Sequence, residues 1–242
     1  YTSASLVDLN GENGVDLVLG NGGDNNNVVY LNNGKGNFNK IRPDILLPPG
    51  LFGQKNTVAL DIFPSDFNYD GKQDLLILQT SFKPFYKGYG LQLLKNQNGN
   101  SFSDITTASF AQGSGKNIND PSKAFIYPAD FYGDGIVDFV IFGSWPTTKN
   151  TNILWINDGS GRFTPFNRSL FDTSDIYDDA NLIYAVDVNK DGRSDLIRVV
   201  GYDSTTDKVY TYLNNGLSVT GLSLPLQILR QPSQTVIKKG AS

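Results

Sequence analysis

The sequence predicts an all-β protein built from four blade-like repeats, each with about four antiparallel strands. Three observations lead to this fold class. An acidic segment of nine residues recurs four times along the chain. Alternating apolar stretches flank each copy, and a further strand-like stretch with a glycine-rich turn follows. The sequence carries no convincing 3.6-residue apolar period, so the pattern favours strands over helices.

The acidic segments define the repeat unit. They occupy residues 8–16, 66–74, 130–138 and 187–195, and their first aspartates recur at steps of about 60 residues. A nearly constant step of this size indicates one supersecondary unit repeated along the chain. We therefore assign residues 1–242 to a single repeat domain, or to part of one.

The first two strands of each repeat are expected on either side of the acidic segment. Before it the chain reads ASLVDL, TVALDIF, AFIYPADF and LIYAVDV. After it the chain reads DLVLG, DLLIL, DFVIF and DLIRVV. Branched aliphatic and aromatic residues dominate these stretches, as is typical of strands on a pleated, half-buried surface.

A third strand and its turn complete the recognisable part of each repeat. They are predicted over residues 28–38, 91–102, 153–163 and 209–216, where Asn-Gly or Asp-Gly pairs mark the turns. A fourth strand is expected to begin at Phe38, Phe102 and Phe163. Four strands in about 60 residues is the content of one propeller blade.

The spacing of oxygen-bearing side chains in each acidic segment predicts a Ca²⁺ site. Ca²⁺ binds about six to eight oxygen ligands. A short loop supplies them from side chains at positions 1, 3, 5 and 9 and from the carbonyl at position 7, and glycine at position 6 permits the sharp turn. The predicted ligands, for up to four ions, are Asp8, Asn10, Glu12, Gly14, Asp16, Asp66, Asn68, Asp70, Lys72, Asp74, Asp130, Asp134, Ile136, Asp138, Asp187, Asn189, Asp191, Arg193 and Asp195.

Two of the segments depart from this pattern. The first has Glu12 at position 5 and Asn13 in place of the glycine, which Asn can replace because it tolerates left-handed backbone. The third has Tyr132 at position 3, and a phenol is a poor Ca²⁺ ligand, so we expect this site to be the weakest. Position 12 lies within a strand pattern in every copy, which excludes an EF-hand.

An alternative interpretation is that Asp, Asn and Gly simply form Asx-turns between strands. Four acidic segments in phase make this less favourable than a metal site, because crowded carboxylates repel one another unless a cation is present. The sequence therefore favours calcium as a staple between strands.

Composition narrows the possible functions. A net charge of −4 argues against nucleic-acid binding, because phosphate backbones attract basic proteins. No apolar run in the sequence is long enough to span a membrane. Cysteine and histidine are both absent, which removes the thiol nucleophile and the commonest general base, so we expect no enzymatic activity.

The four segments and their flanks resemble the FG-GAP/VCBS repeat family, whose consensus reads D-x-[DN]-x-D-G-x-x-D-[LFV] with a later YLNDGxGxF-like turn. The resemblance covers nearly the whole chain. It implies a β-propeller, commonly seven-bladed, as in integrin α-subunit heads and some fungal lectins. It also implies that the loop residues named above hold calcium.

Four repeats leave open how the ring would close, since an open sheet edge is an aggregation hazard. Three arrangements would solve this problem: a small four-bladed ring, a larger ring with further repeats, or pairing with a second chain. Residues 221–242 read like the approach to a fifth acidic loop. This favours a part of a larger propeller.

The sequence favours a non-catalytic binding or adhesion module for a protein or glycan partner, with calcium as its structural cofactor. A carbohydrate-binding lectin is the alternative, and a propeller domain of a larger secreted enzyme or toxin is less favoured. Candidate contact residues are Trp145, Phe85 and Tyr86, which lie in connections rather than strands. An extracellular, periplasmic or cell-surface location is expected, because loops of modest affinity fill only where calcium is plentiful.

Overall fold

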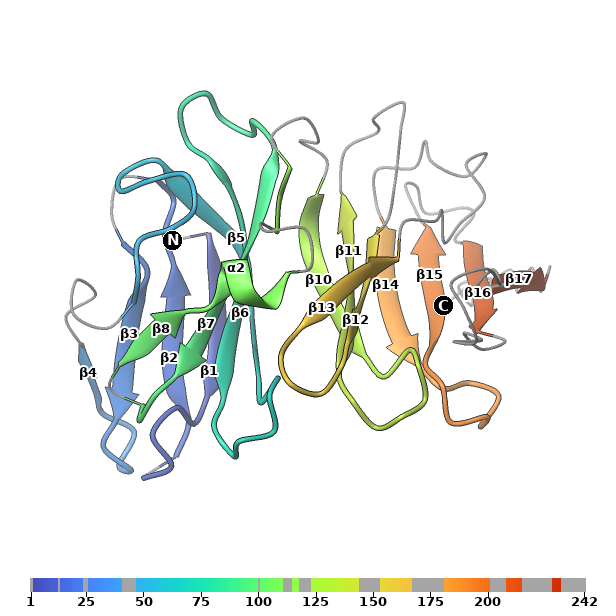
Figure 1. The fold of residues 1–242 in the computed structure, drawn as a ribbon, viewed down its shortest axis with the longest axis horizontal. Coiled ribbons are helices and arrows are strands. Elements are labelled where there is room, and N and C mark those ends of the chain that lie inside the picture. Colours follow the sequence, from blue (N-terminus) through green and yellow to red (C-terminus); the bar gives the residue numbers. More distant parts are fainter. Residues whose placement is uncertain are drawn as a thin grey trace, which may run out of the picture. The chain divides into compact units, whose positions relative to one another are not determined.

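The structure is a computed structural model of the 242-residue chain. It describes residues 2–12, 14–23, 26–40, 47–99, 101–110, 115–117, 123–143, 153–166, 181–200, 208–214 and 228–231. Trp145 lies outside these residues. Within the described residues, four antiparallel sheets follow one another along the chain, which confirms the all-β fold class and the fourfold repeat (Figure 1).

The first and second sheets correspond to the first two predicted repeats. The first has the order β1-β2-β3-β4, with β1 Ser3–Val7, β2 Asp16–Gly20, β3 Val28–Asn32 and β4 Phe38–Lys40. The second has the order β5-β6-β7-β8, with β5 Thr57–Ser65, β6 Asp74–Ser81, β7 Tyr89–Asn96 and β8 Phe102–Asp104.

The third and fourth sheets repeat the same order. The third contains β10 Lys123–Ala129, β11 Asp138–Gly143, β12 Ile153–Asn157 and β13 Phe163–Phe166. The fourth contains β14 Asn181–Val186, β15 Asp195–Val200, β16 Lys208–Asn214 and β17 Ile228–Gln231. The fourth strands begin at Phe38, Phe102 and Phe163, as the sequence predicts.

Two short elements of the second sheet differ from the sequence-based expectation. A single helical turn, α2 (Thr106–Ser109), follows β8. A short strand, β9 (Gly115–Asn117), pairs antiparallel with the start of β7 as a fifth strand. Both elements are too short for a periodic pattern to reveal them.

The chain divides into two compact units. The first comprises residues 1–126 and 157–164, and the second comprises residues 127–156 and 165–242. In the first unit, one apolar cluster joins the first two sheets and includes Val18, Val29, Ala59, Leu75 and Ile77. Strand β6 is buried along its whole length, because it is the inner strand of a sheet covered on both faces.

The second unit has its own core, which joins the third and fourth sheets. Its buried members are Phe131, Val140, Leu154, Ile183, Leu196 and Tyr212. They come from both sheets, so each sheet contributes apolar side chains to this core.

A buried polar network fixes one connection of the first unit. The Gln79 side chain on β6 donates to Gln92 Oε1 on β7 and accepts the Leu51 N–H. Gln92 in turn donates to the Pro49 carbonyl and to Asp104. The segment that enters the second sheet is therefore held on the sheet by amide side chains, not by apolar contacts alone.

Among the described residues, no helix has the length and apolar character needed to cross a membrane.

Candidate metal loops

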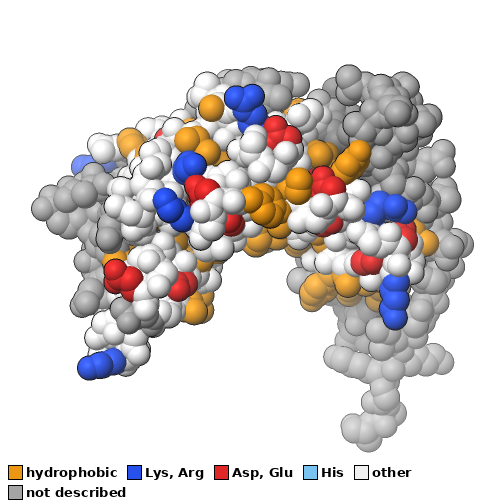
Figure 2. All heavy atoms as spheres, turned by 60° about the horizontal axis from the view of Figure 1, so that its bottom comes forward, with side chains coloured by type: hydrophobic (Ala, Val, Ile, Leu, Met, Phe, Trp, Pro, Cys, Tyr) orange, Lys and Arg blue, Asp and Glu red, His pale blue; other side chains and the backbone are white. Residues whose placement is uncertain are grey.

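Each acidic segment forms the loop between the first and second strands of its sheet. We call these loops 1 to 4: loop 1 (8–16) joins β1 to β2, loop 2 (66–74) joins β5 to β6, loop 3 (130–138) joins β10 to β11, and loop 4 (187–195) joins β14 to β15. Within each unit the two loops project from the same edge of the sheets (Figure 1). Acidic side chains are visible on the face at that edge (Figure 2).

Loops 2 and 4 are folded by the same set of Asx-type hydrogen bonds. In loop 2, the two carboxylate oxygens of Asp66 accept the N–H groups of Asp70 and Gly71 at 3.0 and 2.7 Å. In loop 4, Asp187 accepts those of Asp191 and Gly192 at 3.1 and 2.9 Å. The position-3 amide oxygen also accepts the position-5 N–H in both loops, at 3.0 Å.

Loops 1 and 3 follow this arrangement in part. In loop 3, Asp130 accepts the N–H groups of Asp134 and Gly135, but Tyr132 provides no amide oxygen at position 3. In loop 1, Asp8 accepts the Gly11 N–H, and Asn10 accepts the Glu12 N–H. The first and third loops thus depart from the common pattern where their sequences do.

The backbone turns into the left-handed region at position 4 in all four loops. The residues there are Gly11, Tyr69, Gly133 and Lys190, with φ of 68, 56, 82 and 63°. Position 6 is also left-handed at Gly71, Gly135 and Gly192. The sequence predicts the turn at position 6, whereas position 4 carries no constant residue type and its conformation was not foreseen.

The aspartate at position 9 is buried in every loop and serves the fold. In loop 1, Asp16 accepts the N–H groups of Leu9 and Asn32 at 2.9 and 2.8 Å, which ties the loop to the end of β3. In loop 4, Asp195 does the same with Val188 and Asn214 at 3.0 and 2.7 Å. A carboxylate oxygen has two lone pairs, so these bonds leave capacity for a metal.

Burial changes the acidity of one of these carboxyls. Burial is the main cause that raises the pKa of Asp74 to about 6; the nearby negative charges of Asp70 and Asp66 add to it, and the Asn96 N–H opposes it. The carboxylates of loop 2 therefore repel one another, and a cation bound among them would be stabilising.

Protein cations already approach two of the loops. Lys95 Nζ on β7 lies 3.0 Å from Asp70 Oδ2 in loop 2, and this hydrogen bond raises the pKa of Lys95. Partial burial opposes ionisation of Asp70, but the bonds from Lys95 and the Lys72 N–H outweigh it and lower the Asp70 pKa. In loop 4, Arg193 lies 2.8 Å from Asp191 Oδ2.

The donor set of loops 2 and 4 fits a hard cation such as Ca²⁺. Positions 1, 3 and 5 present carboxylate or amide oxygens on a backbone fixed by its own hydrogen bonds, and Lys95 and Arg193 show that position 5 attracts positive charge. Within the described part of the chain, no group of three or more acidic side chains is already gathered as a metal would hold it. Binding would therefore need rotation of the side chains at positions 1, 3 and 5.

Two of the predicted contact residues form an aromatic pair in one turn of the second sheet. Phe85 and Tyr86 lie in the β6–β7 turn, at the opposite edge of the sheet from loop 2 (Figure 1). The Phe85 side chain is 62% exposed, and its ring meets the Tyr86 ring edge-on at 4.6 Å. Ser81 fixes the turn, since its backbone carbonyl accepts the Tyr86 N–H and its hydroxyl accepts the Lys87 N–H.

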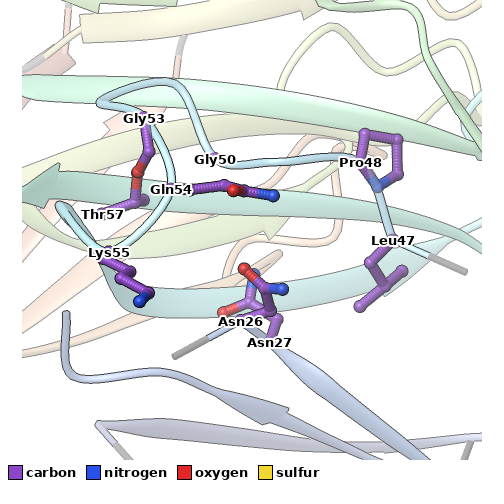
Figure 3. A pocket seen from close by; sticks show the side chains of 9 residues that line it. All are labelled: Asn26, Asn27, Leu47, Pro48, Gly50, Gly53, Gln54, Lys55 and Thr57. Atoms are coloured by element: carbon purple, nitrogen blue, oxygen red, sulfur yellow. The ribbon is translucent and has the colours of Figure 1, made fainter. Parts of the chain in front are cut away.

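A small polar pocket lies in the first unit, between the connection that precedes β3 and the one that precedes β5 (Figure 3). It has a volume of about 20 Å³, enough for a water molecule. The lining residues include Asn26, Asn27, Gln54, Lys55 and Thr57. Lys55 has a left-handed backbone with φ of 60°, which is uncommon for a residue with a side chain. Sequence analysis did not identify this pocket.

Comparisons with known proteins agree with the repeat architecture. The sequence model of the FG-GAP-like repeat matches residues 8–77, 66–141 and 130–198. A solved structure of an Agrocybe aegerita lectin that recognises non-reducing terminal N-acetylglucosamine is similar in fold, with a TM-score of 0.51 at 21% identity. The match covers 87% of this chain and 48% of the lectin chain, so the chain spans about half the length of that protein. No curated protein sequence matches the chain.

Proposed function

The chain belongs to the FG-GAP-like repeat family, and on that premise we propose that it is a non-catalytic, calcium-stabilised β-propeller module that binds a protein or glycan partner. The observation that carries this proposal is the repetition of one acidic loop between the first and second strands of every sheet. A single loop of this kind could serve only its own turn, whereas a bound cation at each of the repeated loops would stabilise every blade.

Calcium would act as a staple between the strands that each loop joins. In loop 2 it would be held by Asp66, Asn68 and Asp70, with the Lys72 carbonyl and Asp74 completing the set, and loop 4 offers the equivalent residues. A divalent cation supplies charge neutralisation for carboxylates that otherwise repel one another. Because these ligands are not assembled in an unfolded chain, the free energy of metal binding adds to the free energy of unfolding.

Isothermal titration of the chelator-treated protein with CaCl₂ tests the metal proposal. We expect heats of binding that fall in Asp66→Ala and in Asp187→Ala, because each substitution removes a position-1 carboxylate and the turn that it holds. The matched control is Asp158→Ala, which removes an exposed aspartate of similar local geometry in the β12–β13 turn. Equal heats in all four proteins would refute calcium binding by these loops.

The partner-binding part of the proposal rests on the exposed aromatic pair in the β6–β7 turn. A large exposed aromatic held on a rigid turn is typical of a contact surface, since it buries much area at little entropic cost. A location outside the cytosol is proposed with it, because extracellular modules bind calcium at about 10⁻⁴–10⁻³ M. Loss of partner binding in Phe85→Ala, with unchanged thermal stability, would support this surface.

The lectin alternative is favoured by the fold similarity and by the polar pocket near Lys55. Amide, ammonium and hydroxyl groups match the hydrogen-bonding needs of a sugar, and a left-handed Lys55 fits the tendency of backbone strain to occur at binding sites. A glycan array that includes N-acetylglucosamine-terminated glycans tests it. Binding that disappears in Gln54→Ala would favour the lectin, and an array without signal would remove it.

A further inference from the structure

Two turns at one edge of the second sheet are joined into a single surface. One turn (residues 81–88) connects β6 to β7, and the other (residues 50–57) leads into β5. Asn56 ties them together, because its backbone carbonyl accepts the Phe82 N–H at 2.9 Å and its side-chain oxygen accepts the Lys83 N–H at 2.7 Å. We call residues 50–57 and 81–88 the paired turns.

Further contacts fix the shape of the paired turns. A Cβ at Gly23, in the connection between β2 and β3, would lie 2.3 Å from Phe82 Cγ, so Phe82 packs directly against the Gly23 backbone. Lys55 and Tyr86 both have a left-handed backbone, with φ of 60 and 57°. Among the described residues, the only other non-glycine residues in this conformation lie at position 4 of loops 2 and 4. Backbone strain of this kind tends to occur at binding sites.

The paired turns expose aromatic and basic side chains together. Phe85 is 62% exposed beside the half-buried Tyr86. Lys55, Lys83 and Lys87 are all exposed. Lys83 Nζ lies 5.1 Å from the centre of the Phe82 ring. Within the described part of the chain, none of these three lysines forms an ion pair with a carboxylate, so their positive charges are available to a ligand.

Charge is divided between the two ends of the second sheet. Loop 2, at the opposite edge, holds Asp66, Asp70 and Asp74, whereas the paired turns contain three lysines and no acidic residue. The chain as a whole has a net charge of −4, so the paired turns are a local reversal of sign. A cluster of one sign attracts ligands of the opposite sign and speeds up their association.

The side chains of the paired turns favour a carbohydrate polymer over a polypeptide. All three cations are lysines, whereas interfaces between proteins are enriched in arginine and depleted in lysine. The pocket beside Lys55 has a volume of about 20 Å³, which leaves no room for an anchoring side chain of a peptide. An exposed phenyl ring offers a flat apolar face to a sugar ring, and the nearby Gln54 amide can bind hydroxyl groups.

We propose that the paired turns bind an acidic polysaccharide, whose sugars carry carboxylate or sulfate groups. Lys55, Lys83 and Lys87 pair with the anionic groups, and the Phe85 ring stacks on the apolar face of a sugar ring. This inference rests on the partner-binding part of the proposed function and names the chemical class of the partner. It does not depend on calcium, because the paired turns lie at the opposite edge of the sheet from loop 2 (Figure 1).

Biolayer interferometry with two immobilised acidic glycans tests this proposal. The probes are oligogalacturonate, which carries carboxylates, and heparin, which also carries sulfates. Both are measured in EDTA, so that neither the metal loops nor bridging calcium ions contribute. We expect binding to at least one probe, and this binding should weaken about tenfold or more between about 0.05 and 0.5 M NaCl, because salt screens exposed ion pairs. Methyl-esterified oligogalacturonate, which has the same sugars without their charge, should bind at least several-fold more weakly than the acid form if the acid form binds.

Variants locate the binding surface. Lys83→Ala and Lys87→Ala combined should weaken binding about tenfold, because two exposed ion pairs are lost. Phe85→Ala should weaken binding several-fold, whereas Phe85→Tyr keeps the ring and should retain it. The matched controls, Lys35→Ala and Tyr184→Ser, remove an exposed lysine and an exposed aromatic outside the paired turns and should leave binding unchanged.

The possible outcomes separate this inference from the proposed function. The inference is overturned if neither probe binds, or if the variants of the paired turns bind as the wild type does. Binding only to immobilised polyglutamate, lost in Phe85→Ala, also overturns it, but leaves the paired turns as a contact surface for a protein partner. Failure of calcium binding in the titrations described above contradicts the metal part of the proposed function and does not affect measurements made in EDTA.

Discussion

The aspartate that closes each loop combines full burial with hydrogen bonds to backbone amides. Asp16 and Asp195 each accept two N–H groups, one from within the loop and one from the end of the third strand. At the residue scale, position 9 therefore supports the turn as well as its predicted metal role. The sequence predicts a metal-ligand role for this residue but gives no sign of its structural role, because its partners there are backbone groups.

The raised pKa of Asp74 predicts a pH dependence in the metal-free protein. The folded state holds this proton up to about pH 6, whereas an unfolded aspartate releases it near 3.8. Between these values the folded state binds more protons, so the free energy of unfolding falls as pH rises through this window. We expect chelator-treated wild type to lose stability from about pH 4 to pH 6 relative to Asp74→Asn in urea titrations. Parallel pH profiles for the two proteins would contradict this assignment.

Position 6 of the loops predicts a graded response to substitution. Gly71 has φ of 85° and open space where a Cβ would lie, so a side chain there meets backbone strain without steric contact. Gly71→Ala should destabilise by about 1–2 kcal/mol. Gly71→Asn should cost less, because Asn tolerates this conformation and stands at the same position in loop 1. Urea denaturation should rank the stability of the three proteins as wild type, then Gly71→Asn, then Gly71→Ala. A Gly71→Asn protein less stable than Gly71→Ala would contradict this prediction.

At the scale of elements, the sequence predicts the regular part of each repeat well. Apolar strand patterns and Asn-Gly turns identify the strands around every loop. The alternation is visible where one face of a strand lies on a core, as in β1 and β2, whereas β6 is apolar because both of its faces are buried. Strand β9 and helix α2 were not foreseen, because each is fixed by a contact distant in sequence. For example, the Thr106 hydroxyl accepts the N–H of Leu93 on β7.

The asparagine at the end of the third strand reads in sequence as an ordinary turn residue. Its side-chain amide donates to a carbonyl 87 residues away in the case of Asn96 and Leu9, so local pattern cannot reveal this role. The available signal was recurrence, since Asn32, Asn96, Asn157 and Asn214 stand at the same place in all four repeats. Asp or Ser could form the same turn. The constant choice of Asn therefore indicates that the amide nitrogen has a hydrogen-bond acceptor of its own.

Removing this asparagine should separate neighbouring sheets. Asn96 is fully buried and its amide donates to the carbonyls of Leu9 and Gln73. Asn96→Ala should destabilise the protein by about 2–4 kcal/mol, because it leaves the buried Leu9 carbonyl and the partly buried Gln73 carbonyl without their donor. Asn32→Ala, measured at dilute protein, is the matched control and should cost under about 1 kcal/mol, because Asn32 is partly exposed and has one such bond. Equal losses in chemical denaturation would show that the bond between sheets carries no special weight.

At the scale of the whole molecule, the fourfold repetition of one sheet was predictable because every copy keeps its acidic loop in phase. The packing of each sheet against its neighbour was not, because it depends on faces that only a structure can identify as buried or exposed. Phe38 and Phe102 illustrate this, since both begin a fourth strand and differ in burial only through what lies beside them.

Calcium should act on the stability of the chain as a whole, because each loop closes a sheet whose first two strands help to form a core. Relative to EDTA, millimolar Ca²⁺ should raise the melting temperature by about 2–4 °C for each kcal/mol of binding free energy. Asp66→Asn and Asp187→Asn should each remove part of this increase. Asp130→Asn should remove the least, because Tyr132 deprives loop 3 of a side-chain oxygen ligand. Scanning calorimetry with Mg²⁺ as the control cation measures these increments. If Asp130→Asn removed the largest share, the ligand positions inferred for these loops would be wrong even though calcium binds.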